Sequence, residues 1–123
     1  MVVSCGVATP WLMVRQADRT LFRFTGRLTT AEGVASAQAF ARVLAAGPTC
    51  VTWDVRAMQG YETGARVAWQ RVLWPYRHNI TSVLVLGGGP FVRLGAITLA
   101  TALDVPLTFR DEGPEAGDEP TGR

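Results

Sequence analysis

The sequence predicts a single α/β domain, in which a mixed four- to five-stranded sheet carries its helices mainly on one face. Three observations lead to this prediction. The chain of 123 residues is long enough for one core and too short for two. Strand-forming runs alternate with helical periodicity in the order β-β-α-β-α-β-α-β. The later strands each follow a helix, so we expect them to be parallel and joined by right-handed crossovers.

The first two strands are expected at Trp11–Gln16 and Thr20–Gly26. In the second strand Phe22 and Phe24 alternate with an arginine, which is typical of a strand with one buried face. The polar turn Ala17-Asp18-Arg19 between the two strands is short. We therefore expect a hairpin.

The first helix is expected to begin at Thr29 or Thr30. Thr29-Thr30-Ala31-Glu32 has the Thr-x-x-Glu pattern of a capping box, in which the hydroxyl and the carboxylate bind free backbone donors. Gly47-Pro48 should end this helix. The apolar positions that recur at helical spacing are Val34, Ala37, Phe40, Ala41 and Leu44.

The central strand is expected at Thr49–Val55, apolar enough to be buried on both faces. A polar loop should follow Asp54, and a second helix should run from about Glu62 to Leu73 before Pro75 ends or kinks it. Glu62 and Arg66 have the i, i+4 spacing of an ion pair on the outer face of this helix. Its apolar stripe consists of Ala65, Ala68, Trp69 and Val72.

The last βαβ unit is expected at Thr81–Leu86, Pro90–Leu103 and Val105–Phe109. Its helix is apolar on most of its circumference, so the part that does not pack on the sheet needs a cover. That cover would be a second copy of the chain, another protein, a lipid-like ligand or the N-terminal segment. Residues 1–110 should form the domain, and the acidic tail 111–123 should be disordered.

Composition and charge argue against several classes of protein. All 12 cationic residues are arginine, and residues 1–110 hold eleven of them against five acids, a formal charge of +6. These arginines are scattered, so we expect a solvated surface and no nucleic-acid site. Cys5 and Cys50 form no metal-spaced cluster, and no metal or cofactor is expected. The start lacks a leader pattern, and no run approaches the roughly 20 apolar residues of a membrane span. We expect a cytoplasmic protein.

Four local matches, together with the element order, resemble the STAS domain, the family of anti-sigma-factor antagonists. The SpoIIAA-like, or STAS/SEC14-like, subgroup is the most similar. The matches cover about residues 11–109 and are Thr20–Leu28, Val51–Arg56, Glu62-Thr63-Gly64 and Ser82–Gly87.

The resemblance implies a non-enzymatic regulatory module that binds a partner protein, such as a regulatory kinase. In the antagonists a partner kinase phosphorylates the first serine of an Asp-Ser-Ser-Gly loop. Glu62 stands at that position here, with Tyr61 in place of the aspartate. The resemblance therefore implies a fixed negative charge at Glu62. Thr63 matches the second serine and is a candidate phosphorylation site.

We expect the partner-binding surface at the loop after the central strand and the start of the second helix. Its candidate residues are Gln59, Tyr61, Glu62, Thr63, Gly64 and Arg66. The alternative for Glu62 and Thr63 is structural: both side chains would cap the second helix and complement its positive end.

A second candidate site is the glycine-rich turn before the last helix. Gly88 and Gly89 would offer free backbone donors to an anion, and Arg93 would add a charge. The turn matches neither a dinucleotide-binding fingerprint nor a P-loop. The alternative is a tight turn that needs flexible glycines.

Enzymatic function is not expected, because no nucleophile, base and orienting group can be assembled from the sequence. Asp54 should hydrogen-bond nearby backbone, and His78 should be a surface or helix-end histidine. The main alternative to a regulatory module is a small hydrophobic-ligand, lipid-like binding protein, with the apolar helix Phe91–Leu103 lining its pocket. The same helix is a candidate homodimer surface.

Overall fold

Six strands form one sheet, with neighbours in chain order from β1 to β6. The computed structural model describes residues 2–3 and 10–111, so the predicted disorder of the tail from residue 112 lies outside the described residues. β1 pairs with β2 and β2 with β3 antiparallel, and the remaining neighbours pair parallel. The strands are β1 (Val2–Val3), β2 (Trp11–Gln16), β3 (Arg19–Leu28), β4 (Thr49–Tyr61), β5 (Ile80–Leu86) and β6 (Leu107–Arg110).

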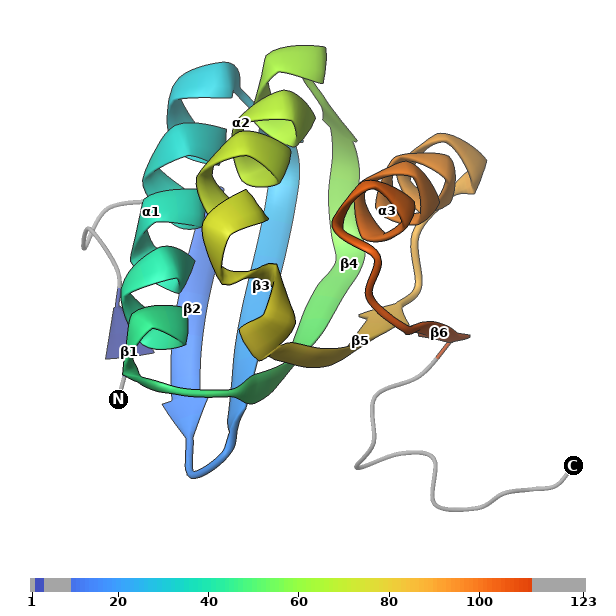
Figure 1. Cartoon of the computed structure of the whole chain (residues 1–123). Coiled ribbons are helices and arrows are strands. Elements are labelled where there is room, and N and C mark those ends of the chain that lie inside the picture. The colour runs from blue at the N-terminus through green and yellow to red at the C-terminus, as the bar shows by residue number, and fades with distance from the viewer. Residues whose placement is uncertain (1, 4–9, 112–123) are drawn as a thin grey trace, which may run out of the picture.

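Three α-helices lie on one face of the sheet (Figure 1). They are α1 (Thr30–Ala46), α2 (Thr63–Leu73) and α3 (Pro90–Leu103), and a 3₁₀ helix η1 (Trp74–Asn79) follows α2. Each crossover from β3 to β6 moves one strand in the same direction. Right-handed crossovers therefore place all three helices on the same side. The predicted fold class is confirmed, with the two-residue β1 as an additional edge strand.

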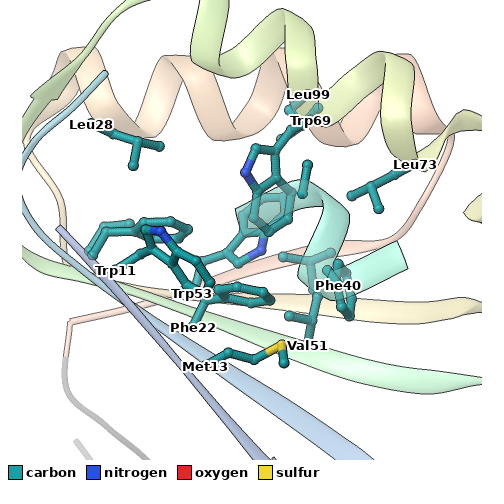
Figure 2. Packing of buried hydrophobic residues seen from close by; sticks show 14 of the residues in the cluster. Trp11, Met13, Phe22, Leu28, Phe40, Val51, Trp53, Trp69, Leu73 and Leu99 are labelled. Atoms are coloured by element: carbon teal, nitrogen blue, oxygen red, sulfur yellow. The ribbon is translucent and has the colours of Figure 1, made fainter. Parts of the chain in front are cut away.

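An aromatic cluster forms the centre of the core between the sheet and the helices (Figure 2). The ring of Phe22 lies 5.1 Å from Trp69 and 5.4 Å from Phe40, both in edge-on geometry. Trp53 meets Trp69 edge-on at 5.7 Å. These contacts join β3, β4, α1 and α2, because the alternating aromatics of the strands meet the buried stripes of two helices.

The predicted capping box of α1 is only half formed. Thr29 is the N-cap residue, and its hydroxyl accepts a hydrogen bond from the backbone N–H of Glu32 at 3.3 Å. The Glu32 carboxylate does not return to the cap. It accepts a hydrogen bond from the indole Nε1 of Trp11 at 2.9 Å instead. The side chain expected to cap the helix therefore joins α1 to β2.

β4 is longer than predicted, and the prediction of a loop after Asp54 is wrong. Residues 57–61 continue the strand and pair with β3, which extends to Leu28. Two register shifts interrupt this pairing, between Arg23 and Thr25 and between Gly26 and Arg27. Bulges of this kind absorb extra residues while the two strands keep hydrogen bonding. The segment after Asp54 is polar and contains glycine, which is typical of loops and also of bulged strands. The sequence pattern therefore predicts a loop where the structure has a strand.

The prediction that the central strand is buried on both faces is also wrong. Val51, Trp53 and Val55 are buried under the helices, whereas on the opposite face Cys50 and Thr52 are half-buried and Asp54 is buried by its two arginine partners. No described helix covers that face, because every crossover turns to the same side.

Candidate functional site

The predicted partner-binding segment lies where β4 ends and α2 begins. β4 is an interior strand, flanked by β3 and β5, so its carboxyl end lies in the middle of the sheet edge. Gln59 and Thr63 are exposed. The other four candidates are half-buried, namely Tyr61, Glu62, Gly64 and Arg66. The segment is therefore accessible at the surface, although it is a strand end and not the loop that we expected.

Glu62 caps a helix, but not the predicted one. Its carboxylate oxygen Oε1 accepts hydrogen bonds from the backbone N–H of Thr30 at 2.7 Å and from the Thr30 hydroxyl at 2.9 Å. Thr30 is the first residue of α1. Glu62 is the N-cap residue of α2, yet its side chain makes no cap hydrogen bond to that helix. The expectation that Glu62 caps the second helix is thus wrong for its side chain.

Hydrogen bonding to Thr30 lowers the pKa of Glu62 below its ordinary value, first through the backbone N–H and then through the hydroxyl. The positive end of α1 favours the same ionised form. A negative charge is therefore held between the first turns of two helices.

The predicted pair between Glu62 and Arg66 is absent from the ion pairs of the described residues. The Glu62 carboxylate is already held by Thr30. Arg66 instead lines a pocket on the other side of α2.

The first turns of α1 and α2 approach each other closely. A Cβ atom added at Gly64 would overlap the Thr30 side chain, and one added at Gly33 would overlap the backbone of Ala65. Only glycine fits at these two positions without moving the helices. The close approach is what brings Glu62 within reach of Thr30.

An apolar cavity of about 70 Å³ lies between α2, α3 and the ends of β3 and β4. The sequence predicted a pocket lined by the helix Phe91–Leu103 only for the ligand-binding alternative, and four residues of that helix do line this cavity. Gly95 and Ala96 of α3 are the sequence features that indicate its position, because small residues on a helix that faces a sheet leave space between the helix and the sheet. The wall is formed by Phe24, Leu28, Trp53, Val55, Met58, Tyr61, Ala65, Arg66, Trp69, Val92, Gly95, Ala96 and Leu99.

Tyr61 and Phe91 link the partner-binding segment to this pocket. Their rings stack at 4.8 Å. A Cβ atom at Gly95 would overlap the ring and hydroxyl of Tyr61, so the absence of a side chain at Gly95 makes room for Tyr61. Phe91 is 58 % exposed, and with Leu94 (60 %) and Ile97 (44 %) it forms an apolar stripe on the outside of α3. The predicted uncovered face of this helix is thus present among the described residues.

One residue of the pocket wall, Trp53, carries a buried polar atom without a partner among the described residues. Trp53 is 4 % exposed, and its indole Nε1 has no hydrogen-bond partner among the described residues. A buried donor without an acceptor costs about 1–3 kcal/mol. The unpaired donor therefore lowers the stability of the core.

The glycine-rich turn is shaped by its backbone. Gly87 and Gly88 have φ angles of 73° and 94°, which L-residues with side chains rarely adopt. The Arg93 guanidinium donates to the Gly87 carbonyl at 3.1 Å and to Asp111 at 2.8 Å. An anion at Gly88 and Gly89 would therefore compete with Asp111 for Arg93. The anion site stays a prediction.

Asp54 is buried on the face of the sheet away from the helices and holds two arginines. Its carboxylate accepts from Arg56 Nη2 at 2.9 Å, from Arg56 Nε at 3.0 Å and from Arg23 Nε at 3.2 Å. It also accepts from the backbone N–H of Arg56 at 3.2 Å, which is the kind of contact predicted for it. Mainly through the Arg56 side chain, these bonds lower the pKa of Asp54 below its ordinary value.

Neither a metal site nor a membrane-spanning helix is found in the part of the chain that the structure describes. No group of three or more His, Cys, Asp or Glu side chains there is arranged to hold a metal ion. His78 is exposed in η1. None of the helices in that part combines the length and the hydrophobicity needed to cross a bilayer.

Comparison with known proteins identifies the fold. No protein-family model matches the sequence, and a search of curated proteins finds no match. Among solved structures, the chain is similar to an uncharacterised DUF3478-family protein with a SpoIIAA-like fold from Shewanella loihica PV-4. The TM-score is 0.64 at 15% identity, over 88% of this chain and 89% of that one.

The chain is also similar to the anti-sigma factor antagonist SpoIIAA in its unphosphorylated form. The TM-score is 0.62 at 10% identity, over 85% of this chain and 91% of that one. The one-sided arrangement of α1, α2 and α3 on a mixed sheet is thus a SpoIIAA-like fold.

Proposed function

We propose that this protein is a non-enzymatic, cytoplasmic regulatory module of the anti-sigma-factor-antagonist type. It docks a signalling protein, such as a regulatory kinase, through the end of β4 and the start of α2. The docking residues are Gln59, Tyr61, Glu62, Thr63, Gly64 and Arg66.

The observation that carries this proposal is the held carboxylate of Glu62 beside the exposed Thr63. Two hydrogen bonds from Thr30 keep the Glu62 charge at one place on the surface. A partner that recognises a negative charge at a helix start would find it there permanently. The resemblance of Glu62-Thr63-Gly64 to the antagonists' phosphorylated loop supports the same surface.

Thr63 is the proposed phosphorylation site. It is exposed and is the first residue of α2, where the positive helix end favours a phosphate. Arg66 follows within the first helical turn and adds a cation. The neighbouring Glu62 carboxylate opposes a second negative charge, so phosphorylation would change the charge balance of the docking surface.

Site-specific photo-crosslinking in the native cells tests the docking surface. We expect p-benzoylphenylalanine at Thr63 or Gln59 to capture one discrete protein, and the same group at exposed Arg71, near the far end of α2, to capture none. Glu62→Gln in the Thr63 probe should weaken the capture. Equal capture from Thr63 and Arg71, or no capture from Thr63 and Gln59, would refute the proposal.

A second candidate function, binding of a small apolar ligand, is favoured by one observation. The cavity between α2 and α3 has an almost wholly apolar wall, to which the Trp53 side chain contributes. The exposed stripe of Phe91, Leu94 and Ile97 is in addition a proposed homodimer surface.

A further inference from the structure

The face of the sheet away from the helices carries a row of arginines. The register of β3 to β6 places Arg23, Asp54, Leu86 and Arg110 side by side on four neighbouring strands. Arg110 faces away from the helices, because side chains alternate along a strand and the adjacent Phe109 packs against the core. No described helix covers this face (Figure 1). Arginines that are scattered in the sequence are thus gathered on one open surface.

Arg56 completes this row. It lies two residues after Asp54, and a Cβ atom added at Gly87 would overlap its side chain, so Arg56 reaches the end of β5. The Asp54 side chain is 5 % exposed, whereas those of its partners Arg23 and Arg56 are 51 % and 41 % exposed. The acid is therefore covered by its two partners, and the surface presents their guanidinium groups to solvent.

The arginine row, which we define as Arg23, Arg56 and Arg110, has more positive than negative charge. One buried carboxylate faces these three guanidinium groups, so the described residues of the row keep an excess of two positive charges. A segment with several acids is attracted to such a surface. The chain itself supplies this segment, because residues 112–123 contain one arginine and four acids, namely Glu112, Glu115, Asp118 and Glu119.

The acidic segment also begins at the right place and is long enough. Arg110 is the last residue of the edge strand β6, and its carbonyl accepts a hydrogen bond from the Gly87 N–H at 2.7 Å. The next residue, Asp111, pairs with Arg93 at 2.8 Å, which holds the start of the segment at the rim of the sheet. Residues 112–119 span up to about 26 Å, whereas β6 and β3 are separated by three strand spacings of ~4.8 Å each.

We propose that the acidic tail, residues 112–119, docks on the arginine row and covers the open face of the sheet. Each exposed ion pair is weak by itself, but a tethered segment with several acids acts at a local concentration on the order of millimolar. Such a contact needs no fixed conformation, so it agrees with a composition that predicts disorder. The tail thereby withholds this face from other acidic partners. This inference goes beyond the proposed docking at the end of β4.

Paramagnetic relaxation in the full ¹⁵N-labelled chain tests the proposal. A nitroxide is attached at Ala116→Cys, in a chain whose own thiols are removed by Cys5→Ser and Cys50→Ser. We expect the label to broaden the amide signals of Thr52 and Leu84, which pair beside the arginine row. The amide signals of α2, on the other side of the sheet, should keep their intensity. Raising the NaCl concentration to about 1 M, where the Debye length is ~3 Å, should remove the broadening.

A matched pair of variants shows which charges hold the tail. Arg23→Gln with Arg110→Gln removes two cations of the row, and we expect the broadening to fall about fivefold. Arg42→Gln with Arg71→Gln removes the same charge from exposed positions on α1 and α2 and should leave the broadening intact. Thermal unfolding verifies that both variants are folded, and the salt series needs neither of them.

Three results would overturn the proposal. Broadening of α2 or α3 signals would put the tail on the helical face, and broadening of neither face would leave the row uncovered. Broadening that survives both 1 M NaCl and the row variant would show that charge does not hold the tail. A mixture of ¹⁴N chain with the nitroxide and ¹⁵N chain without it detects contacts between molecules. Broadening in this mixture would make the tail of a second copy the occupant, which also contradicts the proposal.

Discussion

The helical layer has two halves that are packed in different ways. In the first half α1 and α2 cover β2, β3 and β4, and their first turns touch through Gly33 and Gly64. In the second half α3 lies against β4, on the side away from α1 (Figure 1). An apolar cavity lies between α3 and α2. The same chain thus builds a closely packed pair of helices beside a loosely packed third helix.

Polar groups show the same contrast. Hydrogen bonds tie the first half together, from Trp69 to Ser36 and from Thr30 to Glu62. The second half leaves the Trp53 nitrogen unpaired and exposes Phe91 and Leu94. Loosely packed regions with unsatisfied groups open at lower free energy and supply binding surfaces. The first half is therefore the more firmly held part of the helical layer, and the second half is the part that opens more easily.

The largest difference is expected between two glycine substitutions. Gly33→Ala places a methyl group against the backbone of Ala65, so the helices must separate, and we expect a loss of about 2–3 kcal/mol of unfolding free energy. At Gly95 the atoms nearest to an added methyl group belong to the side chain of Tyr61, which can turn away, so Gly95→Ala should change stability by about 1 kcal/mol or less. Urea denaturation measures both. Equal losses would contradict the contrast between the halves.

Two indole substitutions sharpen the same comparison. Trp69→Phe loses a hydrogen bond to Ser36 as well as packing, and we expect it to cost about 2 kcal/mol. Trp53→Phe removes a donor that has no partner among the described residues, so its cost should be smaller, about 1 kcal/mol. Chemical denaturation monitored by circular dichroism compares them. A larger loss for Trp53→Phe would show that its nitrogen is satisfied in solution.

Acid pH probes the contact that links α1 to the start of α2. The folded pKa of Glu62 is lowered, so its stabilising contribution is complete above the ordinary pKa of glutamate, about 4.3, and is lost as the pH falls through the folded value. Glu62→Gln should therefore destabilise the protein at neutral pH and make little difference in strong acid. Thermal unfolding across this pH range measures the effect.

Thr30→Ala is the matched variant for that measurement. It removes the hydroxyl donor and leaves the backbone donor to Glu62 in place. Its effect at neutral pH should therefore be smaller than that of Glu62→Gln. A constant difference between wild type and Glu62→Gln at every pH would contradict the assigned role.

The smallest effect on stability is expected in the second half. Leu94 is 60 % exposed, so Leu94→Gln should change the unfolding free energy by less than about 0.5 kcal/mol. If the α3 stripe is a dimer surface, the same variant should shift the protein from dimer to monomer in sedimentation velocity. A wild-type protein that is already monomeric at high concentration would exclude the proposed dimer.

Local patterns in the sequence were sufficient for the order of the elements. Alternation in β3 and helical spacing in α1 are properties of neighbouring residues, as are the stops at Gly47-Pro48 and Pro75, so they can be recognised without the fold. The same is true of the apolar excess of α3, which predicted an uncovered face.

Contacts between distant residues decided the rest. The Glu62 carboxylate had two available partners, its own helix and α1, and the close approach at Gly64 selected Thr30. The length of β4 depended on its pairing with the bulged end of β3. The position of the pocket depended on the contact between Gly95 and Tyr61. The sequence alone thus determined which segments form strands and helices, because that is a matter of local periodicity. Tertiary structure decided what each polar group binds, because those partners lie tens of residues away along the chain.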